Sequence, residues 1–161
     1  MNALILYYSY GGNTRKIAEH IQKTLRCGCA EIETVKPYTG DYNSVVNQGQ
    51  QEVDDGFEPE IKHPTKNPDD YDTIILGTPV WWYTYAPAVK TLLSDLDTAG
   101  KIIYPFATNG GWIGHTFRDF EKACQGATVK KGLNVRFDEH TLRTPMADID
   151  RWIDWIKKEN V

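Results

Sequence analysis

Two adjacent glycines, flanked by hydroxyl side chains, are the first residues in this sequence that could do chemistry. They stand in the run Ser9-Tyr10-Gly11-Gly12-Asn13-Thr14, between a continuous apolar segment and a segment with helical spacing. Glycine lets backbone N–H groups turn toward a ligand, and the first turn of a helix leaves such groups without internal partners. One interpretation is a phosphate held by these groups, by the hydroxyls of Ser9 and Thr14 and by the Asn13 amide. The other is a plain helix N-terminus capped by Asn13 or Thr14.

The same run lacks two well-known phosphate-binding patterns. It contains no Gly-x-Gly-x-x-Gly, which disfavours a dinucleotide as the ligand. It also contains no Gly-Lys-Ser/Thr, which disfavours a nucleoside triphosphate held with magnesium. Both of those ligand classes are therefore set aside.

Aromatic residues crowd a second segment, residues 77–87, which follows another buried apolar run. It reads Gly77-Thr78-Pro79-Val80-Trp81-Trp82-Tyr83-Thr84-Tyr85-Ala86-Pro87. Successive side chains of a strand point to opposite faces, so three consecutive aromatic side chains cannot all lie in one core. At least one of Trp81, Trp82 and Tyr83 should therefore face a ligand or a partner, and we favour a planar ring stacked on it. A hydrophobic loop packed on the edge of a sheet is the alternative.

A third segment, residues 108–116, is rich in glycine and reads Thr108-Asn109-Gly110-Gly111-Trp112-Ile113-Gly114-His115-Thr116. Its glycines free backbone N–H groups to approach the edge of a ring, and Trp112 offers a further stacking surface. His115 is either a hydrogen-bonding partner of a ligand or a solvent-facing residue at a helix start. A flexible surface turn is the alternative for the whole segment. The other histidines, His20, His63 and His140, are expected at the surface.

The elements that must position these segments alternate between strand and helix. Apolar runs predict strands at Ala3–Tyr8, around Ile32 and Val35, and at 73–77, 102–107 and 129–137. Apolar residues at helical spacing predict helices marked by Ile17 to Leu25, Val89 to Leu96, Phe117 to Glu121 and Ile149 to Ile156, the first three ended by Gly28, Gly100 and Gly126. Residues 37–70 are expected to be irregular apart from a short helix around Val45 and Val53. Pro105 is unusual within a strand because proline removes a backbone donor.

This alternation predicts an α/β fold with a doubly wound, five-stranded parallel sheet between two layers of helices. Ligands of such sheets bind at the carboxyl ends of the strands. All three glycine- or aromatic-rich segments follow predicted strands, so we expect them to meet at one edge of the sheet.

Composition limits the classes of function. A chain of 161 residues fits a single domain, residues 1–161, and its 25% charged and 40% hydrophobic residues exclude a disordered chain. A net charge of −4 without a basic stripe disfavours nucleic acid as a partner. Cys27, Cys29 and Cys124 have neither a disulfide framework nor a usual zinc spacing, so no metal is expected. With no signal peptide and no membrane-spanning run, we expect a cytoplasmic protein that does not bind membranes.

Taken together, the three segments resemble those of flavodoxins. The patterns Ser-x-Gly-Gly-Asn-Thr, Gly-Thr-Pro-Val-Trp-Trp and Thr-Asn-Gly-Gly-x-x-Gly occur in the order of that family and span essentially the whole chain. The resemblance implies a flavodoxin-like sheet with strand order 2-1-3-4-5 and FMN at its switch point. Two departures are visible. Gly11 stands where flavodoxins usually carry a threonine, and residues 37–70 resemble a subgroup with an insertion after the second strand.

The resemblance also implies which residues hold FMN. Its phosphate would be bound by Ser9, Tyr10, Gly11, Gly12, Asn13 and Thr14. Its ring would be bordered by Thr78, Pro79, Val80, Trp81 and Trp82, with Thr108, Asn109, Gly110 and Gly111 along the pyrimidine edge. No catalytic residue is assigned, because the flavin supplies the redox chemistry.

The function implied is that of an electron carrier between redox partner proteins, and a monomer is expected. The alternative is an FMN-dependent NAD(P)H:quinone-type oxidoreductase. That activity would need an open cleft over the flavin, which Trp112 and His115 could border. The sequence contains no recognisable nicotinamide-binding fingerprint, and this favours the carrier.

Overall fold

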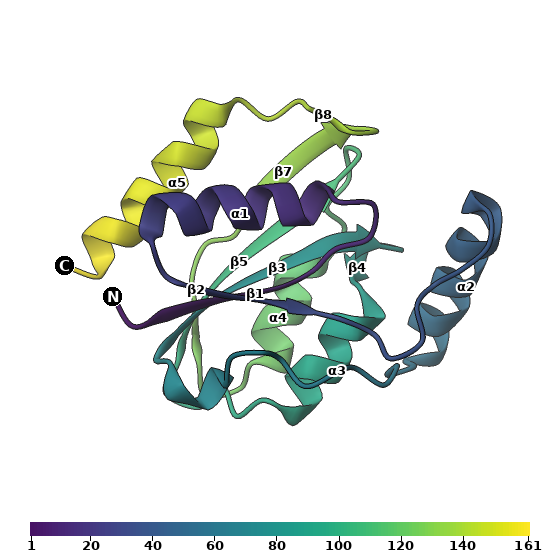
Figure 1. Ribbon diagram of the computed structural model, residues 1–161, viewed down its shortest axis with the longest axis horizontal. Helices are drawn as coiled ribbons and strands as arrows, with labels where there is room; N and C mark the ends of the chain where they lie inside the picture. The colour runs from purple at the N-terminus through teal and green to yellow at the C-terminus, as the bar shows by residue number, and fades with distance from the viewer.

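The apolar run Ala3–Tyr8 forms β1 near the middle of a parallel sheet in the computed structural model, which describes residues 1–161 (Figure 1). Five long parallel strands lie in the order β2 (Gly28–Ile32), β1, β3 (Thr73–Trp81), β5 (Ile102–Asn109) and β7 (Leu133–Asp138). The predicted order 2-1-3-4-5 is therefore confirmed. Three two-residue strands extend the sheet: β4 (Thr84–Tyr85) antiparallel to β3, β6 (Thr128–Val129) parallel to β5, and β8 (Thr141–Leu142) antiparallel to β7.

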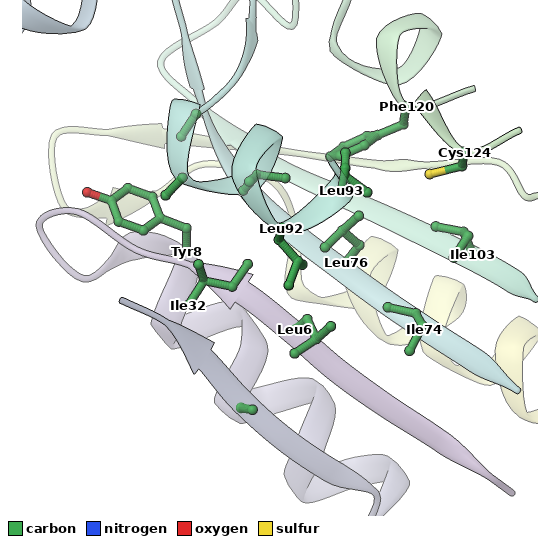
Figure 2. Packing of buried hydrophobic residues seen from close by; sticks show 14 of the residues in the cluster. Leu6, Tyr8, Ile32, Ile74, Leu76, Leu92, Leu93, Ile103, Phe120 and Cys124 are labelled. Atoms are coloured by element: carbon green, nitrogen blue, oxygen red, sulfur yellow. The ribbon is translucent and has the colours of Figure 1, made fainter. Parts of the chain in front are cut away.

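Helices cover both faces of this sheet, which confirms the three predicted layers. One face packs against α1 (Asn13–Leu25) and α5 (Met146–Glu159), and the other against α3 (Pro87–Asp95) and α4 (Thr116–Ala123) (Figure 1). Neighbouring residues of β3 point into different layers. Ile75 joins the core beneath α1 and α5. Leu76 joins the core beneath α3 and α4 (Figure 2).

The second strand begins earlier than its sequence suggests. It runs from Gly28 to Ile32 rather than around Ile32 and Val35. The prediction that Gly28 ends the first helix is wrong, because Arg26 adopts a left-handed conformation with φ 53° and ends α1 itself. Gly28 instead lies inside β2, where an added Cβ would stand 3.0 Å from the Tyr71 hydroxyl.

The predicted fifth strand is divided into β6 and β7, and this division explains how β5 accommodates Pro105. β5 pairs with β6 at Ile102 and Ile103 and with β7 from Phe106 onward. Pro105 falls in the gap between these pairings, so its missing N–H removes no hydrogen bond on that side. The split itself falls beside Gly132, where an added Cβ would lie 2.5 Å from the Phe117 ring.

The insertion after β2 contains more helix than expected. α2 spans Tyr42–Asp55, and the Asp41 side chain caps it by accepting the Ser44 N–H at 2.8 Å. A single 3-10 turn, Pro68–Asp70, precedes β3. Figure 1 shows α2 beyond the carboxyl ends of the strands, beside the edge where the three segments were expected to meet. None of the helices combines the length and the apolar character needed to cross a bilayer.

Candidate functional site

The loop from β1 to α1 presents a run of free backbone donors. Gly11 and Gly12 have positive φ values of 83° and 99°, a conformation that glycine adopts at little cost. The N–H groups of residues 10–14 donate to no acceptor within the protein. An added Cβ on Gly12 would meet no atom within 4 Å, so the space beside this residue is open. Free donors at the N-terminus of a helix, facing open space, suit an anionic group such as a phosphate.

The alternative prediction, that Asn13 or Thr14 caps the helix, is wrong. Gly12 occupies the N-cap position of α1, and neither Asn13 nor Thr14 caps the helix. The Ser9 hydroxyl oxygen instead accepts the Arg15 N–H at 3.1 Å and keeps its own hydrogen for another acceptor. The Arg15 guanidinium pairs with Glu31 at 2.5 Å. This cation is therefore already engaged with β2.

Two predicted phosphate donors also tie the loop to its neighbours. The Thr14 and Thr108 hydroxyls lie 2.7 Å apart, and both residues are buried. The Asn13 side chain donates to the Glu139 carbonyl at 2.7 Å and lies 3.2 Å from the imidazole of His140. The first segment is thereby joined to the end of β5 and to the turn between β7 and β8.

The aromatic segment is a hairpin rather than the expected loop. β3 runs through Trp81, the chain turns at Trp82 and Tyr83, and β4 pairs back along β3. Trp82 and Tyr83 have φ values of 49° and 73°, which cost bulky residues of the order of 1–3 kcal/mol each. Tyr83 leaves 44% of its surface exposed, so one of the three aromatic side chains does face outward. That it faces a ligand or a partner stays a prediction.

Trp81 is the centre of an aromatic cluster with Tyr8, Tyr10 and Tyr38, whose ring centroids lie 5.8, 5.9 and 5.0 Å from it. Burial, helped by the Glu52 carboxylate, raises the pKa of Tyr38, whose hydroxyl donates to Glu52 at 2.6 Å. Burial likewise raises the pKa of Tyr8. Both hydroxyls therefore stay neutral, and the cluster forms an uncharged wall beside the first loop.

Helix α2 closes over the outer side of this wall. The Trp82 indole N–H donates to the Val46 carbonyl at 3.1 Å, and an added Cβ on Gly49 would stand 3.2 Å from the Trp81 ring. Between wall and helix lies a pocket of about 240 Å³, lined by Tyr10, Tyr42, Val45, Val46, Gly49, Val80, Trp81 and Trp82. Sequence reasoning did not place α2 at the site. The only signal was the spacing of Val45, Val46 and Gly49 on one helical face.

The glycine-rich third segment meets the hairpin directly. The His115 N–H donates to the Tyr83 carbonyl at 2.8 Å, and the rings of Tyr83 and Trp112 lie 4.8 Å apart. Trp112 is 67% exposed. Two exposed aromatic rings from different segments thus stand side by side, and such a pair can stack against a planar ring.

The remaining predicted residues differ in their exposure and in their hydrogen bonds. Thr78 is fully buried, and its hydroxyl donates to the Pro79 carbonyl and accepts the Ala86 N–H, which fixes the start of α3. Asn109 accepts the Gly111 N–H at 2.9 Å and donates to Asn134 at 2.6 Å. Gly110 and Gly111 are exposed, whereas Pro79 and Val80 are half-buried. The structure thus brings the three segments together. The buried, hydrogen-bonded side chain of Thr78 indicates a structural role for that residue.

The His115 side chain has one partner that the sequence did not reveal, the Asp119 carboxylate. Its Nδ1 is hydrogen-bonded to the Asp119 carboxylate one helical turn later, and the same carboxylate oxygen accepts the Thr84 hydroxyl at 2.5 Å. A carboxylate that holds Nδ1 fixes the orientation of the imidazole, an arrangement that can serve proton transfer at Nε2.

Comparison with known proteins gives a consistent result. The model of the flavodoxin family matches residues 2–156. A candidate flavoprotein from Bacteroides eggerthii is 28% identical, with a TM-score of 0.80 over 97% of this chain and 98% of its own. A flavoprotein from Lactobacillus acidophilus, solved in complex with FMN, is 26% identical, with a TM-score of 0.74 over 94% of this chain and 97% of its own.

An NADH:FMN oxidoreductase shares only the fold, with 14% identity and a TM-score of 0.63 over 99% of this chain and 90% of its own. The comparison with curated proteins found no match. The family match spans nearly the whole chain and agrees with the observed strand order and the three converging segments. This chain belongs to the flavodoxin family.

Proposed function

We propose that this protein binds FMN and carries electrons between redox partner proteins. The observation that supports this most is the run of unpartnered N–H groups at residues 10–14, at the same edge of the sheet as the outward-facing rings of Tyr83 and Trp112. The related Lactobacillus flavoprotein, solved with FMN, has the same fold at 26% identity. When bound, FMN would supply the electron-transfer chemistry.

The residues divide the work of binding. The N–H groups of residues 10–14 and the Ser9 hydroxyl would hold the phosphate, with Gly11 and Gly12 providing the backbone conformation. Tyr83 and Trp112 would border the ring, and Gly110 and Gly111 would admit its edge. Trp81 and Trp82 would lie behind the residues that border the ring, because the tyrosine cluster and α2 hold them in place. We further propose that residues 1–161 work as one FMN-binding domain.

Titration of the flavin-free protein with FMN and with riboflavin tests this proposal. We expect FMN to bind one per chain with a Kd below about 1 µM, quenching the fluorescence of the flavin and of the tryptophans. Riboflavin lacks the phosphate and should bind on the order of 100-fold more weakly, because charge-assisted hydrogen bonds are lost. A protein that binds neither flavin would contradict the proposal.

One observation favours a second function, that of an FMN-dependent NAD(P)H:quinone-type oxidoreductase. Reduction of a quinone consumes two electrons and two protons, and the His115–Asp119 pair beside Tyr83 could deliver a proton. The fold does not separate the two functions, since the NADH:FMN oxidoreductase shares it.

The two functions separate in one assay, the oxidation of NADH or NADPH by a quinone with FMN-loaded protein and no added reductase. A carrier should be no faster than free FMN. Rapid turnover that His115→Gln abolishes and that His63→Gln leaves unchanged would favour the oxidoreductase. His63 is a suitable control because it lies exposed in the segment before β3.

A further inference from the structure

The turn between β7 and β8 brings His140 to the glycine-rich loop between β1 and α1. Glu139 makes this turn with a φ of 53°. Across it, the His140 imidazole stands 3.2 Å from the Asn13 side chain, and its Cε1 would lie 3.9 Å from a Cβ on Gly11. Gly11 has no side chain, so apart from its chain neighbours the His140 imidazole is the group that lies closest to the loop at that residue.

Hydrogen bonding determines which nitrogen of His140 carries the proton. A backbone carbonyl only accepts, so the Asn13 group bonded to the Glu139 carbonyl is the amide nitrogen. The Asn13 oxygen therefore faces His140, and Nδ1 must donate to it. In the neutral ring Nε2 then carries no hydrogen. It becomes a donor only when the imidazole is protonated.

The charged side chains around His140 do not prevent an anion from binding to it. On its own hairpin, Glu139 is adjacent, and Asp138 is paired with Arg143 at 3.1 Å. On α1, Arg15 is paired with Glu31, and Lys16 is exposed. His140 forms no ion pair with a carboxylate. A phosphate on the free N–H groups of residues 10–14 would thus meet an imidazole with no competing carboxylate bonded to it.

We propose that His140, in its protonated form, is an additional ligand of the FMN phosphate through Nε2. This inference rests on the proposed function. Phosphate monoesters should then bind more tightly at low pH than at high pH, because the neutral ring has no hydrogen on Nε2 to donate. This contact also assigns a binding role to the turn between β7 and β8, which lies 127 residues from Asn13 in the sequence.

The test compares the affinities of wild type, His140→Ala, His140→Gln and the control His63→Gln for FMN and for riboflavin at pH 6.0 and pH 8.5. For FMN, His140→Ala should weaken binding on the order of 10-fold at pH 6.0 and by less than about 3-fold at pH 8.5. At pH 6.0, His140→Gln should bind FMN with an affinity between those of wild type and His140→Ala. It should keep only the pH dependence that the ionisation of the phosphate itself causes, since its amide donates at both pH values. Riboflavin affinity should not change in any variant.

Each other outcome overturns the inference. Equal losses for FMN and riboflavin would mean that His140 acts only by supporting the loop. Equal FMN affinity of wild type and His140→Ala would mean that the imidazole does not contact the phosphate. A wild type that binds neither flavin would overturn the proposed function as well, and this result is distinguishable from the other two. Far-UV circular dichroism and the thermal midpoint verify that each variant is folded.

Discussion

At the scale of single residues, Tyr104 joins the sheet to the last helix through its hydroxyl. This residue is fully buried in β5, and its hydroxyl donates to Glu159 at 2.8 Å and accepts from Asn160 at 3.3 Å. Burial, followed by the Glu159 carboxylate, raises the pKa of Tyr104 to about 12. An unfolded tyrosine ionises near pH 10, so this group stabilises the fold fully below about pH 10 and loses that contribution as the pH rises through about 12.

The prediction concerns Tyr104→Phe, which cannot ionise. At pH 8 the variant should be about 1 kcal/mol less stable than wild type, because the hydrogen bonds to Glu159 and Asn160 are lost. Toward pH 12 the difference should vanish and then reverse, since only wild type must bury a phenolate. Urea unfolding at pH 8, 10 and 11.5 measures this, with Tyr42→Phe as the control because Tyr42 is 79% exposed. A difference that stays constant with pH would contradict the assignment.

Arg136 is a second residue whose position gives a prediction. Its guanidinium lies over Gly111, where an added Cβ would stand 3.6 Å from Nε, and it makes no ion pair. Reduced FMN is more negative than oxidised FMN, so a cation at the ring edge favours reduction. Loss of one charge about 8 Å away at an effective dielectric of about 40 changes this energy by about 1 kcal/mol. For a two-electron couple that equals roughly 20 mV.

We therefore expect Arg136→Gln to lower the midpoint potential of bound FMN by roughly 20 mV at low salt, and by less at high salt. Arg143→Gln removes the same charge from the residue just after β8, but Arg143 is paired with Asp138 at 3.1 Å and should have a smaller effect. Spectroscopic redox titration measures both variants. Equal shifts would show that Arg136 acts only through the net charge of the protein.

At the scale of elements, Gly114 sets the contact between the third segment and the β3–β4 hairpin. Its φ is +60°, and an added Cβ would lie 2.3 Å from the Tyr83 carbonyl oxygen. Gly114→Ala should therefore push the two segments apart, break the hydrogen bond from His115 to Tyr83 and separate the rings of Tyr83 and Trp112. FMN affinity should fall on the order of 10-fold with unchanged far-UV circular dichroism.

The chain offers a matched control for this change. Gly100 also has a positive φ, +78°, but an added Cβ there would meet nothing within 4 Å. Gly100→Ala should cost about 1 kcal/mol of stability from backbone strain alone and leave FMN affinity unchanged. If the two variants bound FMN equally well, the close approach of Gly114 to Tyr83 would have no role in the site.

Comparison of expected and observed elements shows which signals were sufficient. The buried apolar runs of β1, β3 and β5 predicted strands because a parallel strand covered on both faces needs such residues. The hairpin at Trp82 and Tyr83 escaped prediction because tight hairpin turns usually use glycine or asparagine at positions with positive φ. Contacts with α2 and with the third segment hold these two bulky residues there instead.

Part of the candidate site could likewise be predicted from the sequence, and part could not. Its three segments could be predicted because each lies at the carboxyl end of a predicted strand, and parallel strands bring these ends together. The positions of α2 and His140 could not, because both depend on contacts between segments distant in the sequence. Asn13 and His140 are 127 residues apart, and no local pattern links them.

At the scale of the whole molecule, the sheet separates two hydrophobic cores of similar size, each built from 15 buried residues. Neighbouring side chains of β3 supply both, since Ile75 and Leu76 are fully buried on opposite faces. A single rigid sheet between the cores couples them: loss of either leaves one apolar face of the same strands exposed to water. The proposed single domain should therefore unfold in one cooperative step, although its cores share no side chains.

Ile75→Ala and Leu76→Ala test this coupling from the two sides. Each removes a buried aliphatic side chain and should lower the free energy of unfolding by about 2–5 kcal/mol. In both variants, urea unfolding followed by far-UV circular dichroism and by tryptophan fluorescence should give coincident curves with a single midpoint. Circular dichroism reports the helices and strands of both layers, whereas fluorescence reports the surroundings of the tryptophans near the carboxyl ends of the strands, Trp81, Trp82 and Trp112, and of Trp152 and Trp155 on α5. Two separate transitions in either variant would mean that the layer beneath α1 and α5 and the layer beneath α3 and α4 fold independently, and the single-domain proposal would fail.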